Sequence, residues 1–527
     1  MRVSGQWRVF VFLCSAIVQA HAADWVTEHM LAVAAYEQGK YAAAEEHGRA
    51  ALALAESFDK NDLRLEATLT NLGTVLQKRG TCCDAERLLS QALTIREATF
   101  GDDSIETAAG KNNLAAVWQQ AGRADEARKL QSEALSIAER RLGPNDPELV
   151  PYLTLAALTE RDTLQYGQAE RLLKRAQPLA ESISAANPRP LMQVWRYLGS
   201  VYRAAGRFED AEHAYRNLIS LSESRLGADA LDTAIALTSL GAVLCDGKFY
   251  ADGRPYLARA VEIFERIHEL RAPPFVAAVQ TLAAAELYLG RSKSAEQHSL
   301  LAVSALKNSL PLDRDALAVA YNNLGQVYAA QGRLKEAEQV TTEGKDIWIA
   351  SAGRENAKVA AAISNLGAFK VQEHQYKQAE ELYSESAAID LKVAGPSSLA
   401  YARDLNRLGV LYNDEKHYSQ AEEVLRKAVE IDSQKLGSSS PILAEPVLNL
   451  ATSLHSQRRR DEALEYYRRG IEIMTNAGQR DAPKMAVVLD QYSLLLRELK
   501  RWADAEEAST EALGIRVKEK VNGETYR

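Results

Sequence analysis

A repeat of about 42 residues runs through almost the whole chain, and a fixed period of this length limits what the chain can fold into. Its clearest marker is a small residue within a polar stretch, as in the segment KEAEQ that contains Ala337. The equivalent positions are Ala44, Ala85, Ala127, Ala169, Ala211, Gly253, Ala295, Ala337, Ala379, Ala421, Ala463 and Ala505. The interval between them is constant after the first step, which is one residue shorter. Twelve repeats account for the chain after residue 22, which leaves no room for a separate catalytic domain.

Each repeat carries the pattern of two helices joined by a turn. In ten repeats a leucine stands thirteen residues before the marker, as at Leu324, and glycine or alanine follows it. The marker and the third, seventh and tenth positions after it form one stripe of small and apolar residues at helical spacing. Small residues allow two helix backbones to approach closely, and linkers such as LGPNDP at 142–147 separate the repeats. The sequence therefore predicts an all-α chain of about twelve helix-turn-helix repeats.

Two segments depart from this pattern. Pro178 falls inside the second helix of repeat 4, and the segment NPRP follows at 187–190. Because proline removes a helical hydrogen bond and clashes with the preceding turn, we expect an irregular joint near residues 178–190. The repeats fill residues 23–520, and residues 521–527 are expected to form a C-terminal tail.

The first 22 residues have the composition of a secretory signal peptide. Arg2 and Arg8 form a basic start, an apolar run covers residues 9–18, and Ala20-His21-Ala22 resembles a cleavage site. The run is much shorter than the roughly 20 residues that span a bilayer. We therefore expect cleavage after Ala22 and an exported chain, periplasmic or secreted, with no stable membrane span. The alternative is a cytoplasmic chain whose apolar start is retained.

Composition and charge limit the expected partners. Apolar residues make up 46% of the chain, aromatic residues 7% and charged residues 25%, which is typical of many helices packed through small residues. Removal of residues 1–22 changes the formal net charge from −8 to −10, and acidic and basic residues are mixed within the repeats. Because nucleic-acid binding requires a basic face, no nucleic acid is expected as a partner.

Motifs that carry chemistry are missing from the sequence. It has no phosphate-binding glycine loop, no Gly-x-Ser-x-Gly elbow, no His-Glu-x-x-His pair and no paired CxxC spacing. The nine histidines are scattered and lack the spacing of metal ligands. We therefore expect no catalytic residues, no metal, no cofactor and no enzymatic activity.

The order of leucine, small residue, turn, marker and proline-containing linker resembles the tetratricopeptide repeat. The common repeat of that family has about 34 residues, and the longer repeat of this chain is similar to the repeats of kinesin light chains and their bacterial relatives. This resemblance covers roughly residues 24–520. It implies a right-handed α-solenoid, a superhelix with a concave groove that binds peptides or proteins.

The resemblance also points to residues of the groove. In that family the first helix of each repeat lines the groove, and the residue before the leucine points into it. Asparagine is frequent at this position and at the preceding one, so the predicted peptide-binding residues are Asn71, Asn113, Asn322, Asn323, Asn365, Asn406 and Asn449. A carboxamide donates and accepts, so a row of them can pair with the main chain of an extended peptide.

An equally weighted alternative is that these asparagines bond between adjacent first helices and stiffen the stack. Other residue types interrupt the row, such as Thr154, Tyr197 and Arg407. The sequence therefore predicts two binding regions, one around repeats 2 and 3 and one around repeats 8 to 11.

Two adjacent cysteines lie in the turn of repeat 2. Cys82 occupies the position that holds an aromatic residue in other repeats, such as Tyr376, and is expected to be half-buried. Cys83 is expected to face solvent at a helix N-terminus, where a thiol's pKa is lowered. It is therefore a candidate reactive thiol, and an inert pair or a strained vicinal disulfide is the alternative.

These observations predict an exported, non-enzymatic scaffold or adaptor that binds peptide segments or partner proteins in its groove. Two alternatives are a cytoplasmic adaptor similar to kinesin light chains and a helper subunit of an envelope enzyme or assembly complex.

Overall fold

The computed structural model describes residues 24–36, 40–270, 273–308, 312–480 and 482–525, and these residues are almost entirely helical. Residues 24–36 form the first helix of repeat 1. The elements that follow are α2 (Tyr41–Ala55), α3 (Leu63–Lys78), α4 (Cys82–Phe100), α5 (Ile105–Gln120), α6 (Ala124–Leu142), η1 (Pro147–Leu149), α7 (Val150–Asp162), α8 (Tyr166–Ile183), α9 (Arg189–Ala204), α10 (Phe208–Leu226), α11 (Leu231–Asp246), α12 (Tyr250–Arg266), α13 (Pro273–Tyr288), α14 (Ser292–Lys307), α15 (Arg314–Ala330), α16 (Leu334–Ala352), α17 (Ala357–Gln372), α18 (Tyr376–Ala394), α19 (Leu399–Asp414), α20 (Tyr418–Leu436), η2 (Pro441–Leu443), α21 (Ala444–Ser456), α22 (Arg460–Asn476), α23 (Pro483–Glu498) and α24 (Trp502–Thr525).

The repeat predicted from the sequence is confirmed helix by helix. Every second helix, from α2 to α24, begins three residues before its marker. The markers are buried, as at Ala337 and Ala463, and the leucines of the first helices are buried from Leu72 to Leu450. Leu31 is the exception and is exposed. Because a helix can bury a stripe of small and apolar residues only against a neighbour, this register fixes which faces of the helices meet.

The turn inside the hairpins of repeats 2 to 12 uses one backbone conformation. The residue five positions before the marker has a positive φ angle, both where it is glycine, as at Gly332, and where it is not, as at Lys416 with φ 64°. Arg458, in the most basic stretch of the sequence, occupies this turn position with φ 62°. Glycine adopts this conformation without steric cost, but the turn geometry is kept without it.

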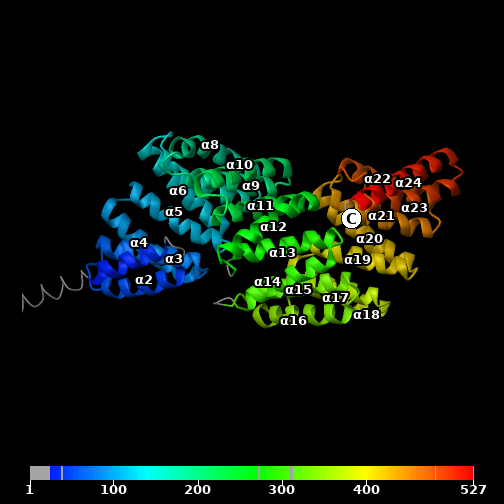
Figure 1. Cartoon of the computed structure of the whole chain (residues 1–527), viewed down its shortest axis with the longest axis horizontal. Helices are drawn as coiled ribbons and strands as arrows, with labels where there is room; N and C mark the ends of the chain where they lie inside the picture. Colours follow the sequence, from blue (N-terminus) through cyan, green and yellow to red (C-terminus); the bar gives the residue numbers. More distant parts are fainter. Residues whose placement is uncertain (1–23, 37–39, 271–272, 309–311, 481, 526–527) are drawn as a thin grey trace, which may run out of the picture. The chain divides into compact units, whose positions relative to one another are not determined.

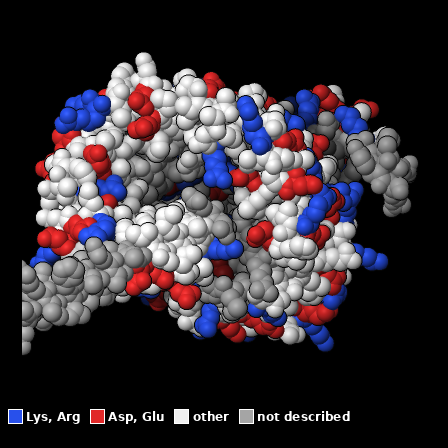
Figure 2. Space-filling model, turned by 60° about the vertical axis from the view of Figure 1, so that its left-hand side comes forward, with Lys and Arg blue, Asp and Glu red and all other residues white. Residues whose placement is uncertain are grey.

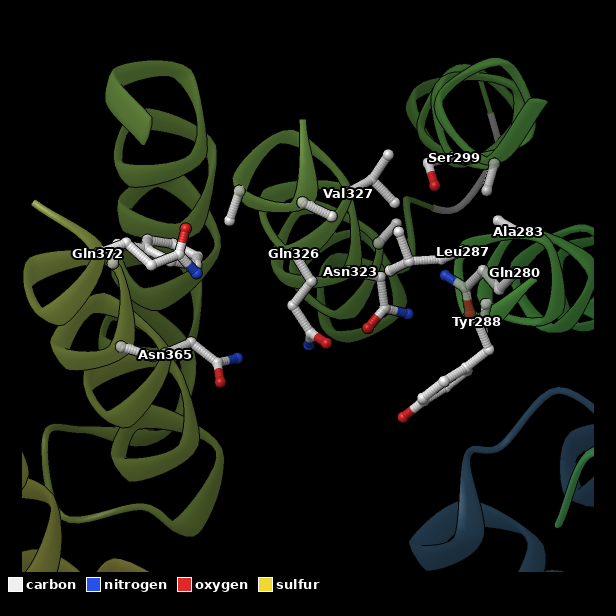
Figure 3. Close-up of a pocket in the computed structure, with 17 residues that line it drawn as sticks. Gln280, Ala283, Leu287, Tyr288, Ser299, Asn323, Gln326, Val327, Asn365 and Gln372 are labelled. Atoms are coloured by element: carbon white, nitrogen blue, oxygen red, sulfur yellow. The ribbon is translucent and has the colours of Figure 1, made fainter. Parts of the chain in front are cut away.

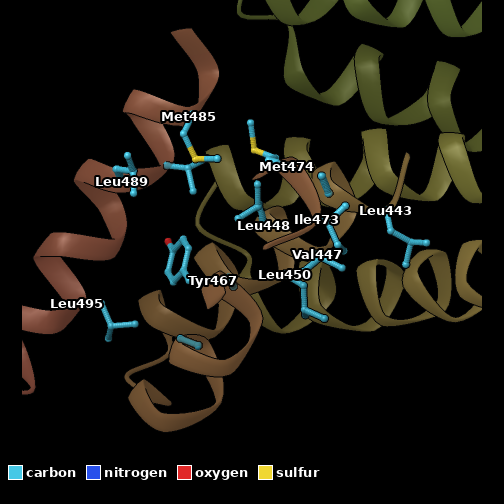
Figure 4. Packing of buried hydrophobic residues seen from close by; sticks show 14 of the residues in the cluster. Leu443, Val447, Leu448, Leu450, Tyr467, Ile473, Met474, Met485, Leu489 and Leu495 are labelled. Atoms are coloured by element: carbon cyan, nitrogen blue, oxygen red, sulfur yellow. The ribbon is translucent and has the colours of Figure 1, made fainter. Parts of the chain in front are cut away.

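The helices form two compact units, Met1–His268 and Glu269–Arg527. Within each unit consecutive helices pack against each other (Figure 1). A buried apolar cluster of the C-terminal unit draws residues from α20, α21, α22, α23 and α24. Figure 4 shows the ring of Tyr467 in this cluster, between the helix that carries Leu489 and the helix that carries Leu448. The all-helical solenoid class predicted from the sequence is confirmed.

A row of ion pairs joins consecutive repeats near the hairpin turns. An arginine four residues before the marker pairs with the glutamate that follows the marker of the preceding repeat. The pairs are Arg123–Glu86, Arg207–Glu170, Arg333–Glu296 and Arg459–Glu422, with N–O distances of 2.6–2.8 Å. Because the arginines are partly exposed, each pair stabilises the stack only slightly.

The departures from the repeat have different outcomes. Helix α8 includes Pro178, and α9 begins at Arg189, so the expected irregular joint stays a prediction about the bend of this segment. Helix α24 runs to Thr525 and includes residues 521–525, which the repeat pattern assigns to the tail. The signal peptide predicted at residues 1–22 lies outside the described residues. Within the described ranges, no helix combines the length and apolar character needed to cross a membrane.

Candidate functional site

A cavity of about 390 Å³ lies within the C-terminal unit, against three successive first helices. Helices α13, α15 and α17 provide most of its lining, and α14 contributes Ser299 and Ala302. Its walls combine small and apolar side chains, such as Leu287, Val327 and Phe369, with five side-chain amides. No charged side chain of the described residues lines it. The cavity therefore offers apolar surface and neutral hydrogen-bonding groups together.

Side-chain amides from all three first helices reach this cavity. Gln280 comes from α13, Asn323 and Gln326 from α15, and Asn365 and Gln372 from α17. Figure 3 shows Asn323, Gln326 and Asn365 projecting toward the same open space. Among the described residues, no hydrogen bond uses the side-chain amides of Gln280, Asn323, Gln326 or Gln372. These amides are available to a ligand.

Other predicted asparagines bond to each other between neighbouring repeats. Asn365 Nδ2 donates to Asn322 Oδ1 at 3.0 Å, and Asn449 Nδ2 donates to Asn406 Oδ1 at 2.9 Å. In both pairs, the acceptor stands two positions before the leucine of its repeat. The donor stands one position before the leucine of the next repeat. Ser364 and Arg407 follow the same rule. These pairs match the alternative interpretation, in which the asparagines stiffen the stack.

A further pair of this kind joins repeats 1 and 2, and repeat 3 has an asparagine that forms no such pair with repeat 4. Asn71 shares a hydrogen bond of 3.2 Å with His29, whose pKa burial lowers. Asn71 also lines a cavity of about 90 Å³ in the N-terminal unit. Asn112 Oδ1 is buried without a partner, because Thr154 in the next repeat donates to the backbone of its own helix at Val150 instead.

The remaining predicted binding residue, Asn113, is half-buried in α5. Of the seven asparagines, Asn323 and Asn365 share one cavity, whereas Asn406 and Asn449 are engaged with each other. The binding row and the stiffening row are therefore partly separate sets of residues.

We expect the double change of Asn406 and Asn449 to Ala to lower the free energy of unfolding by about 0.5–1.5 kcal/mol, the net value of one amide hydrogen bond. Chemical denaturation followed by circular dichroism measures this difference. The double change of the exposed residues Gln375 and Gln378 to Ala is the control. Unchanged stability of the asparagine variant would contradict a stiffening role.

The described cysteines and charged side chains lie outside this cavity. Cys82 is half-buried, and Cys83 is exposed in the first turn of α4; both are free thiols, and the reactivity of Cys83 stays a prediction. Among the described residues there is no cluster of three His, Cys, Asp or Glu side chains able to hold a metal ion. Basic and acidic side chains are interspersed on the face shown in Figure 2.

Five polar residues of the cavity were not predicted from the sequence: Gln280, Tyr288, Ser299, Gln326 and Gln372. Ser299 had a visible signal, because it stands four residues after the marker, where most repeats carry Leu or Tyr. The glutamines and Tyr288 lie at varied distances from the leucine of their repeats, so a single repeat position could not identify them.

The model of the tetratricopeptide repeat family matches residues 25–98, 106–182, 190–266, 358–434 and 443–516, and a second tetratricopeptide-repeat model matches residues 317–343. No curated protein matches the chain significantly.

Several solved structures are similar to parts of the chain. BtubC (BKLC) from P. vanneervenii is 22% identical, with 44% of this chain and 92% of that chain covered and a TM-score of 0.38. A Rap protein complexed with Competence and Sporulation Factor is 15% identical, with coverage of 71% and 99% and a TM-score of 0.47. The apo form of the quorum sensor NprR from B. thuringiensis is 13% identical, with coverage of 71% and 99% and a TM-score of 0.49.

Proposed function

Because this chain belongs to the tetratricopeptide repeat family, whose helical hairpins build extended surfaces for binding proteins, we propose that it is a scaffold that binds an extended peptide segment of a partner protein without chemistry. One observation carries this proposal. Amides from α13, α15 and α17 line one cavity, and four of them have no hydrogen-bond partner among the described residues.

The chemistry of the cavity suits a peptide main chain. An extended peptide presents alternating N–H and C=O groups along its length, and a carboxamide can donate to one and accept from the other. Gln280, Asn323 and Gln372 belong to three successive first helices, so they can meet groups at different points along one peptide. The apolar walls supply burial for its side chains.

The test compares two matched double variants. Changing Asn323 and Gln326 to Ala is expected to weaken peptide binding by about 1–3 kcal/mol, for two hydrogen bonds of about 0.5–1.5 kcal/mol each. The melting temperature should stay nearly unchanged, because these amides form no hydrogen bond among the described residues. The Asn406 and Asn449 double variant should behave in the opposite way, with lower stability and full affinity.

The peptide for this measurement comes from crosslinking. A photoreactive amino acid at the exposed position of Gln326 captures the partner in cells, and mass spectrometry identifies the crosslinked segment. The synthetic segment is then titrated against the wild-type protein and both variants by isothermal calorimetry. Equal affinity for the wild type and the Asn323 and Gln326 variant would overturn the proposed site.

We also propose that the scaffold is exported. The basic start, short apolar run and cleavage pattern of residues 1–22 support this proposal. N-terminal sequencing of the protein from its host tests it. A mature chain that begins at Ala23 is expected, and a chain that retains Arg2 and Arg8 would favour a cytoplasmic adaptor.

A further inference from the structure

The position four residues after the marker controls the space inside each hairpin. In seven repeats it holds a large side chain: Leu89, Leu173, Tyr215, Leu257, Tyr383, Leu425 and Tyr467. All seven are buried. In repeat 10 the residue after the leucine of the first helix is Gly409, which faces Leu425. A Cβ atom at Gly409 would overlap the side chain of Leu425, so the two helices pack closely here. A large residue therefore normally fills this space.

Repeat 7 lacks this large side chain. Ser299 stands at the position of the Leu or Tyr, and Ala283 stands at the position of the glycine. Both line the cavity of about 390 Å³. Ser299 is 3% exposed, and its Oγ has no hydrogen-bond partner among the described residues. A buried hydroxyl without a partner costs free energy, so a ligand that bonds it gains an interaction that the protein itself does not provide.

The lining restricts the side chain that fits beside Ser299. A charged group would lose its hydration without gaining an opposite charge, because none of the lining residues is charged. A purely apolar side chain would suit Leu287 and Val327 but leave the hydroxyl of Ser299 without a partner. A neutral side chain with an aliphatic stem and a hydrogen-bonding end meets both requirements.

We propose that the space at Ser299 is a specificity pocket for a glutamine side chain of the bound peptide. Its stem occupies the volume that Leu or Tyr fills in other repeats, and its terminal carboxamide bonds the Ser299 hydroxyl. This inference rests on the proposed function, because Asn323 and Gln326 hold the peptide main chain beside the pocket.

Selection from a library tests the pocket without a known partner. A random library of short peptides is displayed and selected on the wild-type protein, on A283G/S299L and on N323A/Q326A. The A283G/S299L variant restores the glycine and leucine pair seen at Gly409 and Leu425, so it fills the pocket with a combination that the fold already uses. The matched control is S493G/S509L, which makes the corresponding change in repeat 12, away from the cavity. Thermal melting verifies the folding of each variant.

We expect one position of the peptides selected on the wild type and on S493G/S509L to be enriched in glutamine, and this enrichment to be absent with A283G/S299L. In a peptide recovered on the wild type, Gln→Leu should weaken binding about two- to tenfold. The same exchange should have no effect on S299A, which lacks the hydroxyl. Gln→Glu should weaken binding more than about tenfold on both proteins.

The outcomes distinguish the proposed glutamine pocket from the proposed peptide-binding function. Glutamine enrichment that persists with A283G/S299L, or enrichment of a charged or aliphatic residue instead, overturns the pocket and leaves the peptide-binding function in place. Failure of the wild type to select any peptide, or equal affinity of N323A/Q326A for the selected peptides, overturns the proposed function and this inference with it.

Discussion

Replacing Asp390 by Asn is expected to stabilise the protein at neutral pH by about 1–2 kcal/mol. Asp390 lies in α18 with a fully buried side chain, and neither carboxylate oxygen has a hydrogen-bond partner among the described residues. Arg403 is 3.7 Å away and half-exposed. The equivalent position is Phe264 in repeat 6 and Trp348 in repeat 8, so in those repeats a large apolar side chain occupies it.

A second buried carboxylate adds to the effect. Asp404 in α19 accepts hydrogen bonds from Ser364 at 2.9 Å and from Ser386 at 2.5 Å. The negative charge of Asp404 disfavours ionisation of Asp390. Burial, and then repulsion from Asp404, raise the pKa of Asp390 from its usual 3.8 to about 6.

The sign of the pH dependence follows from this raised pKa. Well below the usual pKa of 3.8, Asp390 is protonated in both folded and unfolded chains and has no effect on stability. As the pH rises toward 6, the unfolded chain loses the proton first, so the folded state becomes less stable by up to about 3 kcal/mol. Asn removes this loss, and the buried carboxamide without a partner keeps part of the cost.

Urea denaturation at about pH 4.5 and pH 7.5, on either side of the raised pKa, measures the difference. The wild type should lose stability between these pH values relative to Asp390→Asn. Asp432→Asn is the matched control at the same position of repeat 10. Burial alone raises the pKa of Asp432, so a smaller gain is expected. Lower stability of Asp390→Asn at the higher pH would show that the ionised carboxylate has a partner and would contradict this account.

The fold could be predicted because each repeat position has one structural role. The small markers, the leucines and the glycine or proline linkers are read directly from the sequence, and they determine where α2 to α24 begin. The family predicted from these residues is confirmed. The signals are redundant, since an exception such as Lys416 in place of the turn glycine leaves the turn unchanged.

The candidate site could be predicted only in part. The asparagine positions identified Asn323 and Asn365, but the same residue type also pairs between repeats, as Asn406 does with Asn449. Which of the two occurs depends on the facing residue of the next first helix, 43 residues away in the sequence. The cavity itself depends on Ala283 and Ser299, whose small size matters only when the hairpin is packed.

Tyr467→Ala is expected to lower the free energy of unfolding of the C-terminal repeats by about 3–5 kcal/mol, the range for removal of a large buried aromatic side chain. Tyr467 is fully buried in α22, and its ring lies near those of His455 and Tyr492, with centroids 6.4 and 6.1 Å away. Its hydroxyl lies 3.2 Å from Thr452 Oγ1. Removal of the ring leaves a space that helices on several sides cannot close.

In Tyr467→Ala the C-terminal repeats should unfold before the rest of the chain. Stability in a repeat array is approximately a sum of repeat and neighbour contributions, so a loss confined to the cluster of α20 to α24 should give an early phase that is no longer two-state. Hydrogen exchange should show faster exchange in α21, α22 and α23 and unchanged exchange in α3 to α6. Tyr467→Phe keeps the ring and should cost only about 0.5–1.5 kcal/mol. Uniformly faster hydrogen exchange across both units would mean that the array unfolds as one cooperative body. A loss of unfolding free energy as small as that of Tyr467→Phe would mean that the neighbouring helices close the space.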